Sequence, residues 1–200
     1  MEKSKTPRRG GGFWWYNGYM EKATLAGGCF WCTEALFKRL KGVSSVTSGY
    51  TGGTKKDPQY HDVSSGLSGH AEAIQIEFDP KILAYKKLIE IFFHLHDPTT
   101  LNRQGNDGGT QYRSAIFCHT PLQMREAQAV KERLDDGHVF RNPIVTTIEM
   151  FAIFYPAEEI HRDYYAKNSY QPYCQYVIDP KVTKLFKDYG DDVKEEYRVR

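Results

Sequence analysis

Gly27-Gly28-Cys29-Phe30-Trp31-Cys32-Thr33-Glu34 is the stretch at which two elements of different periodicity meet. An apolar, strand-like run over 23–26 enters the double glycine, and apolar residues at helical spacing follow as far as Leu40. Cys29 is therefore predicted at a helix N-terminus, where unpaired backbone N–H groups favour an anion. We expect this position to lower the pKa of the Cys29 thiol below that of a free cysteine. A buried cysteine in an aromatic core is the alternative interpretation.

The composition favours one domain with no strongly charged or membrane-embedded surface. The chain has 200 residues and a formal net charge of +2, so no global field recruits nucleic acid or a membrane. No apolar run approaches the roughly 20 residues of a membrane span, and no apolar segment of signal-peptide length follows the basic N-terminus. We expect a partly mobile extension over 1–20, a single domain over 21–200 and a cytoplasmic location. The four cysteines are then expected to be reduced or redox-active.

Strand-like and helical patterns alternate along the rest of the chain. Alternating or β-branched apolar residues predict strands, which cover 43–50, 71–78, 114–118 and 144–153. Helical spacing and end signals predict helices, which cover 82–95, 120–137, 156–167 and 182–189. The polar, Gly-rich stretches 54–69 and 99–112 are predicted to be long loops. This order indicates an α+β fold, a two-layer α/β sandwich in which helices pack on a mixed sheet with long irregular loops.

Several short motifs point to a family. In chain order they are Gly28-Cys29-Phe30-Trp31, Gly49-Tyr50-Thr51-Gly52-Gly53, Tyr60, Gly69-His70-Ala71-Glu72-Ala73, His96-Asp97-Pro98, the run from Gln104 to Ser114, and Lys167-Asn168. In these motifs and their spacing, residues 22–175 resemble the A class of peptide methionine sulfoxide reductases. The resemblance implies a ferredoxin-like sandwich and reduction of the S epimer of methionine sulfoxide, free or in proteins. It also implies thioredoxin as reductant, no metal or organic cofactor, and a role in repair under oxidative stress.

The resemblance also implies a role for each residue of the first motif and for one acid. Cys29 matches the nucleophile, whose thiolate attacks the sulfoxide sulfur and becomes a sulfenic acid. Phe30 and Trp31 match the residues that hold the substrate's S-methyl group. Glu72 matches the acid, and to donate a proton near neutral pH its pKa must be raised by desolvation. On strand pattern alone, Glu72 would be a surface residue.

Two tyrosines and an aspartate complete the implied site. Tyr60 and Tyr112 match the residues whose hydroxyls point at the sulfoxide oxygen, which is the logic of an oxyanion hole. Asp107 matches the residue that orders the site and contacts the substrate's amide, although by itself it would be a turn residue. Glu34, one helical turn after Cys29, is expected to have a capping or dipole role rather than an acid role.

The resolving thiol is left open between two cysteines. Cys174 lies where many family members place a resolving cysteine, but its segment lacks the glycines that usually accompany it. Cys32 stands where many members have glycine, and it forms a C-x-x-C pair with Cys29 that can close a disulfide. The two thiols could also act in series. Cys118, in an apolar strand, is predicted to be a buried structural thiol.

Other functions have weaker support in the sequence. A general thiol–disulfide oxidoreductase would use Cys29 and Cys32 but would leave Glu72 and the two tyrosines idle. A nucleic-acid module would use the basic leader and the aromatic cluster 13–16, beside a nearly neutral core. A zinc site lacks a second C-x-x-C or a histidine pair at ligand spacing. We expect a monomer that binds neither nucleic acid nor membrane.

Overall fold

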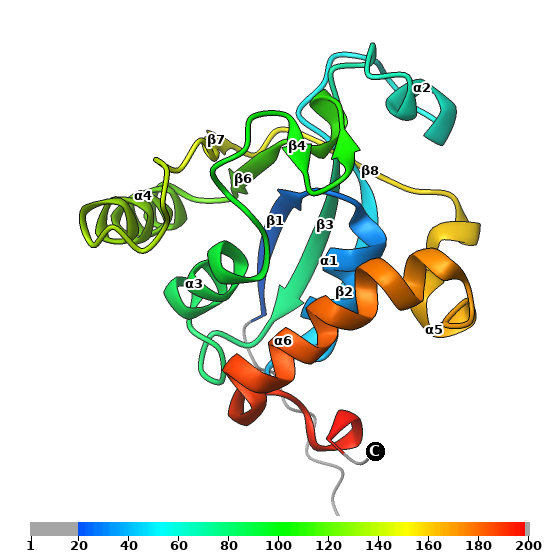
Figure 1. Ribbon diagram of the computed structural model, residues 1–200. Helices are drawn as coiled ribbons and strands as arrows, with labels where there is room; N and C mark the ends of the chain where they lie inside the picture. The colour runs from blue at the N-terminus through cyan, green and yellow to red at the C-terminus, as the bar shows by residue number, and fades with distance from the viewer. Residues whose placement is uncertain (1–19, 199–200) are drawn as a thin grey trace, which may run out of the picture.

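A six-stranded mixed sheet organises residues 20–198, which the computed structural model describes (Figure 1). The strand order is β7-β6-β1-β3-β2-β8. Within it β6 and β7 pair in parallel and the other neighbours pair antiparallel. A separate two-stranded ladder joins β4 (Arg103–Gln104) to β5 (Asp107–Gly108). The strands of the large sheet are β1 (Glu21–Gly27), β2 (Val43–Thr51), β3 (Ala71–Phe78), β6 (Ser114–Cys118), β7 (Thr147–Met150) and β8 (Phe154–Pro156).

Most of the helices gather on one face of this sheet. Figure 1 shows α1, α3 and α6 lying across that face, with α4 beside α3. The C-terminal helix continues from a π-helical turn, Cys174–Ile178. The helices are α1 (Phe30–Phe37), α2 (Tyr60–Ser64), α3 (Tyr85–Leu95), α4 (Pro121–Asp136), α5 (Tyr164–Lys167) and α6 (Asp179–Tyr189).

The core forms because each strand alternates between two apolar faces. In β3, Ile74, Ile76 and Phe78 point into the main core beneath the helices, whereas Ala71 and Ala73 belong to a smaller cluster on the opposite face. Successive side chains of a strand point to opposite faces, so this division follows from the period of two. The structure therefore confirms a mixed α/β fold; the ferredoxin-like, two-layer arrangement stays a prediction.

The two predicted long loops contain short elements. In 54–69 the chain forms α2, which begins with a capping box in which Gln59 and Asp62 satisfy each other's backbone N–H groups. In 99–112 it forms β4, β5 and a 3₁₀ turn, Thr110–Tyr112. These elements are two to five residues long, so they leave no periodic pattern in the sequence.

The predictions for 144–167 were wrong in two places. The expected strand 144–153 is limited to β7, and the expected helix from Pro156 is absent, because Pro156 ends β8. Pairing of Gly49 with Pro156, and the hydrogen bond from Ala157 N to Ser48 O, hold this backbone extended. A helix begins only at α5, after a 3₁₀ turn at 159–161. At the chain end, α6 begins three residues before the expected helix.

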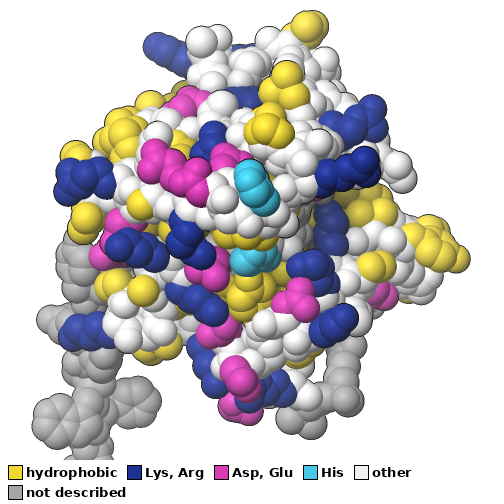
Figure 2. Space-filling model, turned by 60° about the vertical axis from the view of Figure 1, so that its left-hand side comes forward, with side chains coloured by type: hydrophobic (Ala, Val, Ile, Leu, Met, Phe, Trp, Pro, Cys, Tyr) yellow, Lys and Arg dark blue, Asp and Glu magenta, His cyan; other side chains and the backbone are white. Residues whose placement is uncertain are grey.

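Two further observations concern the surface and the chain end. Basic and acidic side chains are interspersed on the face shown in Figure 2. No helix among residues 20–198 is long and apolar enough to cross a membrane. The predicted extension lies outside the described residues except for Met20, and so does the aromatic cluster 13–16.

Candidate active site

Cys29 is the N-cap residue of α1, at the junction that the sequence predicted. The chain leaves β1 at Gly27 and turns through Gly28, whose φ is +89°. A Cβ on Gly28 would lie 2.6 Å from the side chain of Gln104, so this turn requires glycine in both conformation and space. Cys29 keeps 7% of its surface exposed. Cys29 therefore lies just beneath the surface, at the N-terminal end of a buried helix.

Glu72 lies beside this helix end rather than on the surface. Its carboxylate oxygen Oε2 accepts a hydrogen bond of 3.0 Å from the backbone N–H of Phe30, the residue after Cys29. The Glu72 side chain is 2% exposed. Burial raises its pKa to about 8, against the opposing effect of the Phe30 N–H. Glu72 is thus a protonated carboxylic acid at neutral pH, next to a thiol.

The expected depression of the Cys29 pKa is wrong. Burial raises the pKa of the Cys29 thiol well above its usual value, and the nearby Glu72 adds to this effect. Cys29 also donates a hydrogen bond to the Cys32 sulfur, which favours the protonated form of Cys29. Desolvation outweighs the helix N-terminus here because a buried thiolate loses its hydration.

Cys32 is the thiol whose pKa is lowered. It lies in the first turn of α1 with 1% of its surface exposed. The Cys29 hydrogen bond and the positive charge of Lys181, together with a hydrogen bond from Lys181, lower the pKa of Cys32 to about 6 despite its burial. The Tyr173 hydroxyl lies 3.8 Å from the Cys32 sulfur. Within the pair, the charged form is therefore favoured on Cys32 and the protonated form on Cys29.

The two predicted tyrosines come from different elements and are half-buried near Glu72. Tyr60 is the first residue of α2, and Tyr112 ends the 3₁₀ turn after β5. Burial raises the pKa of each, and the charges of Glu72 and Cys29 contribute to both shifts. Both hydroxyls therefore remain protonated donors close to the thiol and the acid.

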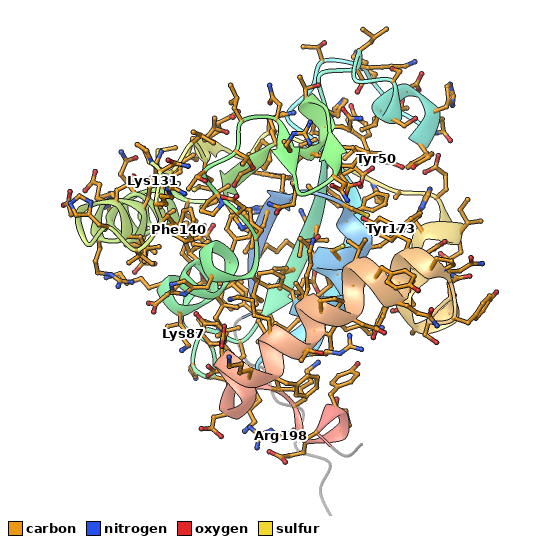
Figure 3. The ribbon with its side chains drawn as sticks, viewed as in Figure 1. Tyr50, Lys87, Lys131, Phe140, Tyr173 and Arg198 are labelled. Carbon is orange, nitrogen blue, oxygen red and sulfur yellow. The ribbon has the colours of Figure 1, made fainter. Side chains whose placement is uncertain are left out.

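Asp107 reaches the same site through a tyrosine. Its Oδ2 accepts a hydrogen bond of 3.0 Å from the Tyr173 hydroxyl, and that hydroxyl also contacts Cys32. Figure 3 shows Tyr173 at the end of the C-terminal helical segment that passes in front of α1. Asp107, in β5, is thus tied to the thiol pair rather than being only a turn residue.

Two aromatic residues that the sequence did not single out, His161 and Tyr164, complete a wall of rings beside Cys29 that also contains Phe30 and Trp31. Trp31 stacks on Tyr164 of α5 with ring centroids 3.7 Å apart and an interplanar angle of 8°. Its indole Nε1 donates to Nδ1 of His161 at 3.2 Å. The imidazole also lies 5.2 Å from the ring of Phe30 and 4.7 Å from the ring of Tyr60. Both residues come from the segment predicted as a plain helix, so no local pattern marked them.

His161 itself is buried, and burial lowers its pKa. Because Nδ1 accepts the indole hydrogen, the neutral ring carries its proton on Nε2. The aromatic rings beside Cys29 therefore present mainly apolar surface, and the Nε2–H group of His161 is an N–H donor among them that has no hydrogen-bond partner within the described residues.

The remaining cysteines are buried free thiols, as are Cys29 and Cys32. Cys174 is fully buried in the π-helical turn before α6, and burial raises its pKa. Cys118 lies in β6 with its sulfur 3.9 Å from the Tyr85 hydroxyl, as predicted for a structural thiol.

Glu34 does not cap α1, contrary to expectation. It is buried, and its Oε1 accepts a hydrogen bond from the backbone N–H of Asp163, which has a φ of +55°. Burial raises the pKa of Glu34 to about 6. Asp163 also pairs with Lys38 and immediately precedes α5. Glu34 thus anchors the segment that carries Tyr164 onto Trp31.

The arrangement places a buried thiol pair, a neutral carboxylic acid and phenolic donors around one point, beside an aromatic wall. Such a set can deliver a sulfur nucleophile and a proton to a small polar group. Within residues 20–198 no cluster of three or more His, Cys, Asp and Glu side chains is arranged to hold a metal ion.

Comparisons with known proteins point to one family. The family model described as peptide methionine sulfoxide reductase matches residues 21–193. The chain is 51% identical over 175 residues to peptide methionine sulfoxide reductase MsrA of Saccharolobus solfataricus, covering 88% of this chain and 98% of that protein. It resembles reduced Mxr1 of Saccharomyces cerevisiae with a TM-score of 0.71 at 37% identity, over 78% of this chain and 89% of that one. Mxr1 in complex with Trx2 is similar with a TM-score of 0.51 at 29% identity, over 72% and 84% of the two chains.

Proposed function

Because the chain belongs to the peptide methionine sulfoxide reductase family, we propose that it reduces the S epimer of methionine sulfoxide, free or in proteins, to methionine. Cys29 is the nucleophile, and the oxygen is transferred to it as a sulfenic acid. The observation that carries this proposal is the hydrogen bond from Phe30 N to Glu72, which holds a protonated carboxyl beside the Cys29 thiol.

The first step needs a nucleophile, a base and an acid. Cys29 donates its proton to the Cys32 thiolate as its sulfur attacks the sulfoxide sulfur. Glu72 protonates the oxygen, which would otherwise carry the developing negative charge. The sulfur–oxygen bond of the substrate breaks, methionine leaves, and Cys29 keeps the hydroxyl as a sulfenic acid. Cys32 is then a thiol and Glu72 a carboxylate, so protons and electrons balance.

The surrounding side chains orient the substrate. The Tyr60 and Tyr112 hydroxyls hydrogen-bond the sulfoxide oxygen and stabilise charge there. Phe30 and Trp31, held by their ring contacts, receive the S-methyl group and exclude water. Asp107, fixed by Tyr173, accepts from the amide of the substrate. Selection of one epimer follows because methyl and oxygen must occupy chemically different subsites.

A second thiol then attacks the sulfenic acid, which forms a disulfide and releases water. A dithiol protein reduces this disulfide and restores the two thiols. Cys32 and Cys174 are the two candidates for the attacking thiol. The solved complex of Mxr1 with Trx2 supports a thioredoxin as the reductant. We place the protein in the cytoplasm as a monomer that repairs oxidised proteins in the response to oxidative stress, without a metal or organic cofactor.

Epimer-resolved turnover tests this function. With dithiothreitol as reductant, the protein should convert free and peptide-bound methionine S-sulfoxide to methionine and leave the R epimer unreacted. Cys29→Ser should abolish turnover, whereas Cys118→Ser, at the buried thiol on β6, should retain it. Equal use of both epimers, or full activity in Cys29→Ser, would contradict the assignment. Disulfide reductase activity without sulfoxide turnover would instead favour a general thiol–disulfide oxidoreductase built on Cys29 and Cys32.

A further inference from the structure

The carboxylate of Glu158 is a hydrogen-bond acceptor shared by two elements that surround the site. Its Oε1 accepts from the backbone N–H of Tyr60 at 2.7 Å, and its Oε2 accepts from the Tyr50 hydroxyl at 2.8 Å. Tyr60 begins α2, Tyr50 lies in β2, and Glu158 itself follows β8. Although desolvation raises the pKa of Glu158, these hydrogen bonds outweigh it and lower the pKa below its ordinary value. Glu158 is therefore a carboxylate at neutral pH that joins three segments of the chain.

The bond to Tyr60 matters because α2 is a short helix between irregular segments. It has five residues, and the first N–H groups of any helix have no partner within the helix. The capping box of α2 serves other N–H groups, so Glu158 is the acceptor for Tyr60 N. The opposite end of α2 is held separately, by a hydrogen bond of 3.1 Å from Gln111 Nε2 to Ser64 O. Glu158 thus fixes the end of α2 that carries the Tyr60 phenol.

The same carboxylate faces the imidazole that holds the indole of Trp31. Glu158 Oε2 lies 3.9 Å from Nε2 of His161, and Nδ1 of that ring accepts from the Trp31 indole N–H. This distance is too long for a hydrogen bond. A negative charge beside Nε2 nevertheless favours the tautomer that carries its proton there, and this tautomer leaves Nδ1 free to accept. Glu158 therefore acts on Trp31 through His161, in addition to its direct bond to the backbone of Tyr60.

We propose that Glu158 is a positioning residue that sets the two substrate subsites relative to each other: the oxygen subsite through Tyr60, and the methyl subsite through His161 and Trp31. The inference rests on the proposed function. The methyl group and the oxygen of a sulfoxide are bonded to one sulfur atom, so productive binding needs both subsites in the correct relative position. Because one carboxylate acts on both, its loss should displace the phenol and the indole together.

Two substitutions of Glu158 separate its two effects on turnover of methionine S-sulfoxide with dithiothreitol. Glu158→Ala removes both contacts, so kcat should fall about tenfold and KM should rise about tenfold. Glu158→Gln keeps a carbonyl oxygen for the Tyr60 N–H but removes the charge that faces His161. Its kcat should stay within about twofold of wild type, while KM rises about threefold or more. Glu159→Ala, at the exposed neighbouring position, should change neither quantity. A purely structural role would not separate KM from kcat in this way.

A double-mutant cycle tests whether Glu158 acts through the Tyr60 phenol. Tyr60→Phe alone should lower kcat by about tenfold or more, because it removes one of the two donors to the sulfoxide oxygen. In the Tyr60→Phe background, Glu158→Ala should change kcat by less than about twofold, whereas independent effects would multiply. Multiplicative effects on kcat would overturn the proposal. A Glu158→Gln protein with the wild-type KM, or with a kcat as low as that of Glu158→Ala, would also overturn it.

Amide hydrogen exchange tests the contact without sulfoxide chemistry. In protein labelled with isotopic nitrogen on tyrosine, the Tyr60 amide signal is identified by its absence in Tyr60→Phe. This amide should exchange at least about tenfold faster in Glu158→Ala than in wild type, and at nearly the wild-type rate in Glu158→Gln and Glu159→Ala. Equal exchange rates in Glu158→Ala and wild type would overturn the proposal. Fast exchange in Glu158→Ala, in a protein whose wild type reduces no sulfoxide, would instead overturn the proposed function and uphold the Glu158–Tyr60 contact.

Discussion

Replacing Glu72 by glutamine should change activity and stability in opposite directions. The side chain is 2% exposed, and its Oε2 accepts from Phe30 N at 3.0 Å. A glutamine carbonyl can accept the same hydrogen bond in nearly the same volume, so the helix end should keep its place. What the substitution removes is the transferable proton.

The activity effect follows from the role of the acid. Loss of a positioned general acid typically lowers a rate by about 10²–10⁴-fold, or about 3–5 kcal/mol of transition-state stabilisation. The wild-type rate should also fall as pH rises through about 8, because Glu72 ionises there and can no longer donate. Glu72→Gln should lose this alkaline limb. Turnover of methionine S-sulfoxide with dithiothreitol, measured across pH, gives both quantities.

The stability effect follows from the same pKa. Between the ordinary Glu pKa of 4.5 and about 8, the folded protein holds a proton on Glu72 that the unfolded chain releases. The free energy of unfolding therefore falls as pH rises through this window, by about 4–5 kcal/mol at its upper end. Glu72→Gln removes this loss, so the variant should be more stable than wild type above about pH 8 and differ least below about pH 4.5.

Urea unfolding at several pH values measures this difference. The matched control is Glu77→Gln, on the same strand, where the side chain is 44% exposed and pairs with Lys22. That variant should change neither the rate nor its pH dependence, and surface pairs contribute at most about 1 kcal/mol to stability. Glu72→Gln with the wild-type rate at all pH values and an unchanged pH dependence of stability would refute the reasoning.

Three further outcomes are expected. Gly28→Ala should destabilise the protein by about 1–3 kcal/mol in urea unfolding, because the residue has a φ of +89° and the new Cβ would meet Gln104 at 2.6 Å; wild-type stability would contradict the strained turn. Changing Tyr60 and Tyr112 together to phenylalanine should lower kcat by about 10²-fold or more, through loss of the donors to the sulfoxide oxygen; an unchanged kcat would remove that role. Trp31→Phe should raise KM for methionine S-sulfoxide by about tenfold, because the indole loses its hydrogen bond to the neighbouring imidazole; an unchanged KM would show that this bond does not hold the methyl subsite.

The sequence could predict the parts of this site that local pattern controls. The change from strand to helix at Gly28 and Cys29 was visible in the spacing of apolar residues, and the structure confirms it. The strand pattern alone favoured a surface position for Glu72, and this expectation was wrong, because the side chain is buried. Glu72 has the same parity as Ile74 and Ile76, so the period of two that buries those residues directs its carboxyl inward.

Tertiary contacts decided the rest, because they join elements that are distant in the chain. The lowered pKa of Cys32 depends on its hydrogen bond with Cys29 and on the charge of Lys181, which lies on α6, a helix that packs against α1. No helix begins at Pro156 because β8 pairs with β2, and His161 and Tyr164, which lie in the short helical turns that follow, contact Trp31. The spacing of apolar residues predicts only how a residue is placed within its own helix or strand. A pKa or an aromatic stack depends on neighbours that only the assembled fold supplies.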